Sequence, residues 1–241
     1  LYDPALVVWT GVDPLADEYG GISPYVYCGD NPVSAIDPDG KKLILVGTWE
    51  QRMLILRQMQ KLTNDKLGMK RNTGEIIIMN RGTKNQNRNL KKGSSLISSV
   101  ISNEHTTTIG LTTNSSHAHR IYRLDAINGK GTDTQIWYNI EEKPFVLTKD
   151  EGTGKIYKEA IPSQIVLGHE LIHGLRNMNG TGRHWNIRKE YKYTDTQGGV
   201  WRDTKKLEEL ETVGIISDER NKEYTENNLR KEQHLNIRIE Y

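Results

Sequence analysis

The spacing of apolar positions changes several times after residue 40, as in a domain that mixes helices and strands. A short apolar run over residues 43–46 predicts a buried strand, and apolar side chains at helical spacing predict an amphipathic helix over residues 49–62. A second helix is predicted around residues 96–101. Further strand-like runs stand at residues 76–79, 106–112, 135–140 and 145–148. This alternation predicts an α+β fold.

The most apolar predicted helix carries a group of polar side chains. Ser163 is a suitable N-cap, and the segment up to Leu175 is apolar on most sides, which is typical of a buried helix. His169 and His173 are four residues apart, so both imidazoles project from one side and can hold a tetrahedral Zn²⁺. Glu170 is expected to be the general base. Two hydrogen-bonded core histidines are the alternative, but burying these groups without a metal would be costly.

A zinc site that does chemistry usually has three protein ligands, and the helix supplies only two. Arg176 and Asn179 stand where a metzincin has glycine and histidine, which excludes that class. A glutamate from a second helix is the remaining possibility. Residues 203–214 predict such a helix, with Asp203 or Thr204 as its cap and Gly214 as its stop. Helical spacing leaves three candidate ligands, namely Glu208, Glu209 and Glu211.

Composition limits the other kinds of function. The 33 basic and 31 acidic residues leave a net charge of +2, which argues against a protein built to neutralise many phosphates. Cys28 is the only cysteine, so an internal disulfide and a cysteine-based zinc cluster are both excluded. No apolar run is long enough for a membrane helix. One basic stretch, residues 81–92, lacks the interleaved aromatic residues that stack on bases, so we interpret it as a solvated loop.

The first 40 residues differ from the rest, since they hold five of the seven prolines. Their motifs resemble the end of an RHS-repeat core, the cap of polymorphic toxin shells. These motifs are Asp13-Pro14-Leu15-Ala16, Ser23-Pro24-Tyr25, Gly29-Asp30-Asn31-Pro32 and Ile36-Asp37-Pro38-Asp39-Gly40. The resemblance implies an RHS-core segment over residues 1–40, a toxin domain over residues 41–241, and a cognate immunity protein. Many such shells cut themselves at a leucine after the last glycine, and Lys41 departs from that pattern.

Four ordered blocks in the last third of the chain resemble the NleD-like effector metallopeptidases. The blocks are His169-Glu170-Leu171-Ile172-His173, Glu208-Glu209-Leu210-x-Thr212-Val213-Gly214, Thr225-Glu226-Asn227-x-Leu229-Arg230 and Arg238-x-x-Tyr241. This resemblance implies a zincin-like fold and proteolysis inside a target cell. Among the paired acids it favours Glu209 as the third ligand, with Glu208 as the alternative.

The same resemblance places further residues near the site. Thr212 is expected to lie next to a metal-binding residue without binding the metal itself. Asn227 and Arg230 either orient the site and contact substrate or tie down the C-terminal helix. Outside these blocks, His184 is a candidate ligand or transition-state donor, against the alternative that it is simply exposed. Tyr191 and Tyr193 are candidates for steadying an oxyanion.

Together these inferences predict a zinc-dependent endopeptidase effector at the end of an RHS toxin. Its substrate is expected to be a protein in the cytoplasm of a target cell, where Glu170 takes a proton from water activated by Zn²⁺. The alternatives are a nucleic-acid-active toxin that uses residues 81–92, and a catalytically dead binding module. The sequence opens at Leu1 without the basic and apolar regions of a secretory signal, so we expect it to continue a longer chain.

Overall fold

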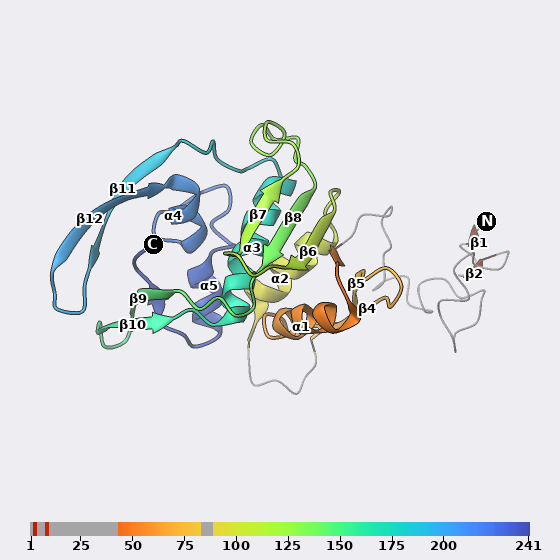
Figure 1. Ribbon diagram of the computed structural model, residues 1–241, viewed down its shortest axis with the longest axis horizontal. Coiled ribbons are helices and arrows are strands. Elements are labelled where there is room, and N and C mark those ends of the chain that lie inside the picture. Colours follow the sequence, from red (N-terminus) through yellow and green to blue (C-terminus); the bar gives the residue numbers. More distant parts are fainter. Residues whose placement is uncertain (1, 4–7, 10–42, 83–88) are drawn as a thin grey trace. The chain divides into compact units, whose positions relative to one another are not determined.

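The computed structural model describes residues 2–3, 8–9, 43–82 and 89–241 (Figure 1). The chain divides into two units, Leu1–Gly40 and Lys41–Tyr241. In the first unit, β1 (Tyr2–Asp3) pairs antiparallel with β2 (Val8–Trp9). The RHS-like motifs after residue 10 lie outside the described residues, so the assignment of an RHS segment and a toxin domain stays a prediction.

The second unit is built on a four-stranded sheet in the order β3-β6-β8-β7. Its parallel part consists of β3 (Leu43–Leu45), β6 (Thr107–Leu111) and β8 (Thr134–Tyr138). At the edge, β7 (His117–Arg120) pairs antiparallel with β8. Burial alternates residue by residue along β8, so one face of the sheet packs against the core.

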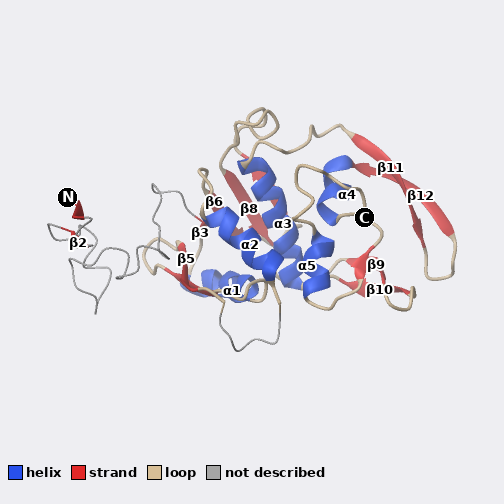
Figure 2. Cartoon of the chain, turned by 180° about the vertical axis from the view of Figure 1, so that it is seen from behind, coloured by secondary structure: helices blue, strands red, loops and turns tan. Residues whose placement is uncertain are grey.

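The helix α3 (Ser163–Met178) lies at the centre of the domain. It packs against β7 and β8 on one side and against α1 (Trp49–Gln60), α2 (Lys91–Ile101) and α5 (Glu226–Glu232) elsewhere (Figure 2). Every residue of α3 from Ile165 onward is buried. The helix can approach its neighbours closely because Gly168 faces Leu229, where an added Cβ would come within 2.6 Å of a methyl group.

Three smaller sheets surround this core. β9 (Phe145–Lys149) pairs with β10 (Ile156–Ala160) and with β13 (Ile237–Arg238). β4 (Lys66–Met69) pairs with β5 (Ile76–Asn80). A long hairpin of β11 (Arg188–Thr194) and β12 (Val200–Lys206) leads directly into α4 (Leu207–Val213).

The predicted α+β fold with a buried active-site helix is confirmed, and the differences lie at element boundaries. The helix α4 begins at Leu207 instead of Asp203, because residues 203–206 are drawn into the pairing of β12 with β11. It ends as predicted at Gly214, whose φ of 89° suits glycine. Pro162 is the N-cap of α3, and the Ser163 hydroxyl instead donates to the Ile140 carbonyl.

The end of the basic stretch differs from the predicted loop. Residues 83–88 lie outside the described residues, whereas Lys91 and Lys92 begin α2. The Glu232 carboxylate accepts the backbone N–H groups of Lys92 at 2.7 Å and of Gly93 at 2.6 Å, which caps that helix from α5. None of the helices within the described ranges is long and apolar enough to cross a membrane.

Gly93 provides a test of the packing of α2 against the turn that follows α1. A Cβ at this position would lie 1.8 Å from the Leu62 carbonyl oxygen, which is backbone and cannot rotate away. We expect Gly93→Ala to lower the free energy of unfolding by about 1–3 kcal/mol, although alanine favours helix. Ser98→Ala in the same helix is the control and should change stability little. Denaturant unfolding measures both, and an unchanged or raised stability of Gly93→Ala would contradict this packing.

Candidate metal centre

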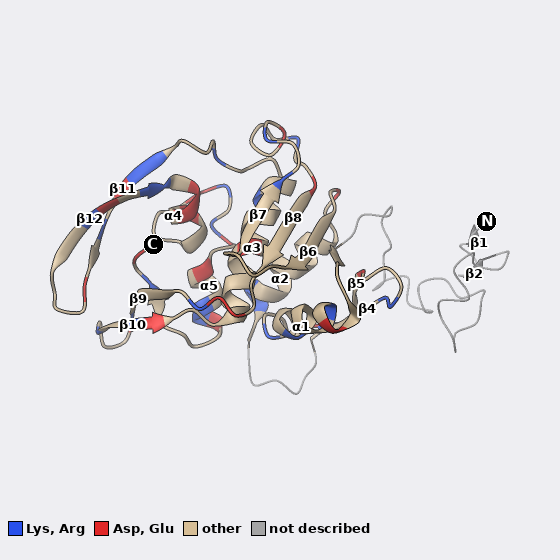
Figure 3. Cartoon of the chain, viewed as in Figure 1, with Lys and Arg blue, Asp and Glu red and all other residues tan. Residues whose placement is uncertain are grey.

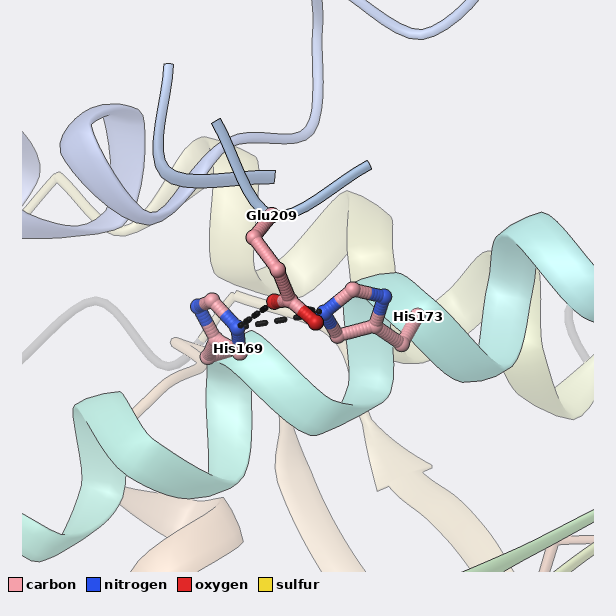
Figure 4. Close-up of side chains that lie close together, drawn as sticks. All are labelled: His169, His173 and Glu209. Atoms are coloured by element: carbon pink, nitrogen blue, oxygen red, sulfur yellow. Dashed lines mark hydrogen bonds and ion pairs between the residues drawn. The ribbon is translucent and has the colours of Figure 1, made fainter. Parts of the chain in front are cut away.

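Two imidazoles and one carboxylate converge beside α3. The Nε2 atoms of His169 and His173 lie 3.1 Å apart, and Oε2 of Glu209 lies 3.4 Å from the first and 3.0 Å from the second (Figure 4). One ligand atom from each residue falls within 4.8 Å of the others. A tetrahedral zinc ion holds neighbouring nitrogen and oxygen ligands about 3.4 Å apart. The three donors therefore have the identity and the spacing that Zn²⁺ requires.

The three glutamates of α4 have three different partners. Leu210 and Val213 of this helix are fully buried and anchor it. Glu209 points between the two histidines, whereas Glu208 approaches His173 from the other side of its ring, with Oε1 3.0 Å from Nδ1. Glu211 is buried in an ion cluster, where it accepts from Arg183 and Arg176 and so ties α4 to α3. The geometry thus separates acids that sequence spacing could not rank.

Each imidazole is oriented by a carboxylate at its second nitrogen. Nδ1 of His169 lies 3.0 Å from Oε2 of Glu226, and Nδ1 of His173 faces Glu208. A carboxylate accepts a hydrogen bond, so this arrangement fixes the proton on Nδ1 and leaves the Nε2 lone pair for a metal. Both rings are therefore held in the tautomer that a metal ligand needs.

Arginine side chains offset the negative charge of the two carboxylates that orient the imidazoles. Arg120 of β7 donates to both oxygens of Glu208, at 2.8 and 2.7 Å. Burial alone would raise the pKa of Glu208, but His173 and Arg120 lower it to about 2. Arg230 and Arg238 donate to Glu226 at 2.7 and 3.0 Å. Against the effect of burial, Arg238, His169 and Arg230 likewise hold the pKa of Glu226 well below its usual range.

The carboxylates around the site favour the protonated, positively charged form of both imidazoles. Burial lowers the pKa of His173, but the carboxylates of Glu209 and Glu208 outweigh it and raise that pKa to about 10. The pKa of His169 is also raised, because Glu209 and Glu226 outweigh its burial. Burial would raise the pKa of Glu209, but His173 and His169 hold it well below its ordinary value. A site that stabilises protonated imidazoles in this way is equally suited to a divalent cation.

Glu170 lies next to His169 on α3, with only 7% of its surface exposed. Burial raises the pKa of its carboxyl group, although the nearby imidazoles oppose the shift. A raised carboxyl pKa brings this group closer to neutral pH, which suits a residue that accepts and returns a proton.

Tyr241 brings a hydroxyl group to the cluster. Its O–H donates to Oε2 of Glu209 at 2.8 Å, and its ring lies 6.2 Å from that of His169 between centroids. Arg238 stacks over the ring at 4.6 Å, and the Tyr191 hydroxyl accepts the Tyr241 backbone N–H at 3.0 Å. Burial and the charge of Glu209 raise the pKa of Tyr241, so the phenol stays protonated at neutral pH.

The other residues singled out from the sequence take varied positions. Asn227 ties β13 to α5, since it accepts the Arg238 N–H at 2.7 Å and donates to its carbonyl at 2.9 Å. Arg230 reaches the site only through Glu226. Thr212 is fully buried, and its hydroxyl has no hydrogen-bond partner among the described residues. His184 is exposed and pairs with Asn186 at 2.6 Å, outside the cluster.

Four residues of the site received no role from the sequence. Glu226, Arg238 and Tyr241 stand inside motif blocks that were recognised, so the blocks carried a signal. Arg120 had no recognisable sequence signal, because it lies 88 residues before the carboxylate that it contacts. Tyr191, considered as an oxyanion donor, instead fixes Tyr241 in place, and Tyr193 stacks on it at 5.8 Å.

Two solved structures show a distant likeness to this chain. The apo, zinc-removed form of the botulinum neurotoxin type C light chain matches at 15% identity with a TM-score of 0.32, covering 44% of this chain and 27% of that one. The serotype C1 light chain protease matches at 15% identity with a TM-score of 0.30, covering 43% of this chain and 27% of that one. The chain thus spans about a quarter of the length of these light chains. No curated protein matches the sequence.

The family comparison is decisive. Residues 51–241, most of the chain, match the profile of peptidase family M91, which is described as "Effector protein". This match contains the histidine pair, Glu209 and every carboxylate that contacts them. The expectations of an effector peptidase and of a zinc cofactor are therefore confirmed. The chain belongs to peptidase family M91 and is a zinc metallopeptidase.

Proposed function

We propose that this domain is the toxin of an RHS-type polymorphic toxin and that it hydrolyses a peptide bond of a protein inside a target cell. The observation that carries the catalytic part is the convergence of Glu209 on the Nε2 atoms of His169 and His173, at 3.4 and 3.0 Å. In this proposal His169, His173 and Glu209 hold Zn²⁺. The paired acids Glu208 and Glu209 have separate roles in this proposal, because Glu208 orients His173 instead of binding metal.

The chemistry needs a metal and a base. Bound zinc polarises the scissile carbonyl and lowers the pKa of water. Glu170, whose pKa burial raises, accepts the proton of the attacking water and delivers it to the leaving amine. Both transfers use one carboxylate, and a pKa raised above that of an ordinary glutamate favours the return of the proton. This requirement supports Glu170 over Glu208, whose pKa is lowered to about 2.

Tyr241 is suited to the negative charge that develops on the carbonyl oxygen. Its hydroxyl stays protonated and already lies within hydrogen-bond distance of a metal ligand. A donor fixed beforehand stabilises an oxyanion without reorganising during the reaction. Tyr191 and Arg238 provide that fixation, the first at the backbone of Tyr241 and the second at its ring.

The biological setting rests on the motifs of residues 1–40. Their resemblance to an RHS core supports a toxin presented by the shell of its parent polypeptide, delivered into the cytoplasm of a target cell and matched by an immunity protein. No specific observation favours a nucleic-acid-active toxin, since residues 83–88 of the basic stretch lie outside the described residues. A catalytically dead binding module is disfavoured by the complete set of zinc donors beside a buried glutamate.

Glu170→Gln tests the general base. The amide keeps the shape of the side chain but cannot take the proton, so we expect a loss of activity of about 10²-fold or more with normal zinc content. Zinc quantification and cleavage of proteins in intoxicated cells measure the two properties. Glu141→Gln, an exposed change outside the site, is the matched control. Undiminished killing by Glu170→Gln would end the proposal.

Glu209→Gln and Glu208→Gln together test the assignment of the third ligand. Loss of Glu209 removes a ligand, so we expect zinc no longer to copurify at one equivalent. Loss of Glu208 removes only a partner of His173, so zinc should remain bound with an affinity weaker by about 10- to 100-fold. Competition with a chelator measures both affinities. If Glu208→Gln weakened zinc binding more than Glu209→Gln, the two roles would have to be exchanged.

Tyr241→Phe tests the hydroxyl at the oxyanion position. We expect kcat to fall by about 10²-fold with little change in KM or zinc content, because the phenol acts in the transition state. Steady-state kinetics on a cleaved peptide gives the two constants separately. A rise in KM alone, with kcat preserved, would mean that Tyr241 only binds substrate.

A further inference from the structure

The β11–β12 hairpin projects from the domain without support from another sheet. Its register runs from Arg188 opposite Lys206 to Thr194 opposite Val200, and within the described ranges neither outer edge is paired. Tyr191 is its one buried residue. A lone two-stranded hairpin is marginally stable in water, and free strand edges readily accept another strand. A partner strand bound along the hairpin would stabilise it and would pair with one of its free edges.

One face of the hairpin is strongly basic. Residues that pair directly across the strands share a face, and the face containing Arg188 and Lys206 is exposed at every position except Thr194. Figure 3 shows Lys and Arg positions on both strands of the hairpin. This basic face is formed by Arg188, Glu190, Lys192, Thr194, Val200, Arg202, Thr204 and Lys206.

Most of the positive charge on the basic face is uncompensated. The only acid on it, Glu190, pairs with Arg202 at 2.8 Å. Among the described residues no carboxylate forms an ion pair with Arg188, Lys192 or Lys206. Val200 on the same face is 70% exposed, an apolar side chain that water surrounds. The basic face is therefore complementary to an acidic partner that also carries an apolar group.

The opposite face connects the hairpin to the metal centre. Tyr191 contacts the backbone of Tyr241, whose hydroxyl reaches Glu209. At the base of the hairpin, the backbone of Leu207 donates to the Ile187 carbonyl at 2.9 Å, immediately before the two acids of α4. Figure 1 shows the hairpin extending beyond α4 and the C-terminus. A chain lying on it would therefore continue away from the site of hydrolysis.

We propose that the β11–β12 hairpin is a docking arm for an extended acidic segment of the protein substrate, outside the residues at the scissile bond. The segment adds to a free edge through backbone hydrogen bonds, and its carboxylates contact the basic face. This inference rests on the proposed peptidase function. Under this inference, substrate selection depends in part on substrate residues that lie far from the cleaved bond.

The arrangement of aromatic residues favours a peptide over a nucleic acid. Binding of single strands combines cations with aromatic rings on which bases stack. The basic face holds no aromatic side chain, since Tyr193 and Trp201 project from the opposite face. Trp201 is further engaged by Asp195, which accepts its indole N–H at 2.6 Å.

Binding of a model peptide tests the docking arm without any cleavage. Fluorescein-labelled decaglutamate and decaglutamine are titrated against zinc-loaded protein at low and moderate salt, with fluorescence anisotropy as readout. We expect decaglutamate to bind at least about tenfold more tightly, which is the effect of three exposed ion pairs, with salt weakening it. The variant Arg188→Glu/Lys192→Glu/Lys206→Glu should lose this preference. The control Lys61→Glu/Lys66→Glu/Lys91→Glu, with the same change of charge elsewhere, should retain it.

Cleavage gives a second, separate readout. A short peptide found to be cleaved is extended by six glutamates or by six glutamines. We expect the glutamate tail to raise kcat/KM about tenfold for the wild-type protein and for the control, and not for the hairpin variant. If no peptide is cleaved, the peptidase proposal fails while the binding experiment still decides the docking arm.

Three results would overturn the docking arm. The first is equal binding of the two decapeptides by the wild-type protein. The second is loss of the preference in the control as well, which would reduce the effect to overall charge. The third is a labelled single-stranded oligonucleotide that binds more tightly than decaglutamate and depends on the same three cations.

Discussion

Two imidazoles buried on a central helix constrain the rest of this structure. The helix α3 is enclosed by the sheet and by four other helices, so little of the surface of its side chains is exposed to water. Burying ionisable groups is costly unless other groups pair with them. His169 and His173 are each held at Nδ1 by a carboxylate, and Glu209 lies between their Nε2 atoms. The fold supplies those carboxylates from elements far from α3 in the chain.

The charges around the histidines imply a cation. The four carboxylates of Glu170, Glu208, Glu209 and Glu226 outnumber by one the three arginines that contact them, Arg120, Arg230 and Arg238. Against the effect of burial, the carboxylates of Glu209, Glu208 and Glu226 raise the pKa of the imidazoles that they contact. The Nε2 atoms would bind zinc in place of those protons, while Glu226 and Glu208 hold the rings at Nδ1. The arrangement that orients the ligands therefore also favours the metal.

The sequence predicted the parts of this site that are local and not the parts that are assembled by the fold. The histidine pair and Glu170 stand in one short motif on a helix, and the family resemblance singled out the paired acids of α4 in a second short motif. Arg120 joins Glu208 across 88 residues, which no local pattern encodes. The start of α4 was misplaced for the same reason, because pairing with β11 extends β12 to Lys206. The hydrogen bond from Tyr241 to Glu209 spans 32 residues and likewise forms only in the folded protein.

A crystal structure of the zinc-loaded wild-type domain, with diffraction data collected on both sides of the zinc absorption edge, tests the central claim most directly. We predict one strong anomalous peak bonded to Nε2 of His169, Nε2 of His173 and a carboxylate oxygen of Glu209, at distances of about 2.0–2.2 Å. Glu208 and Glu226 should remain on the Nδ1 atoms. A peak bonded to Glu208 in place of Glu209, or zinc bound away from the two histidines, would contradict the account.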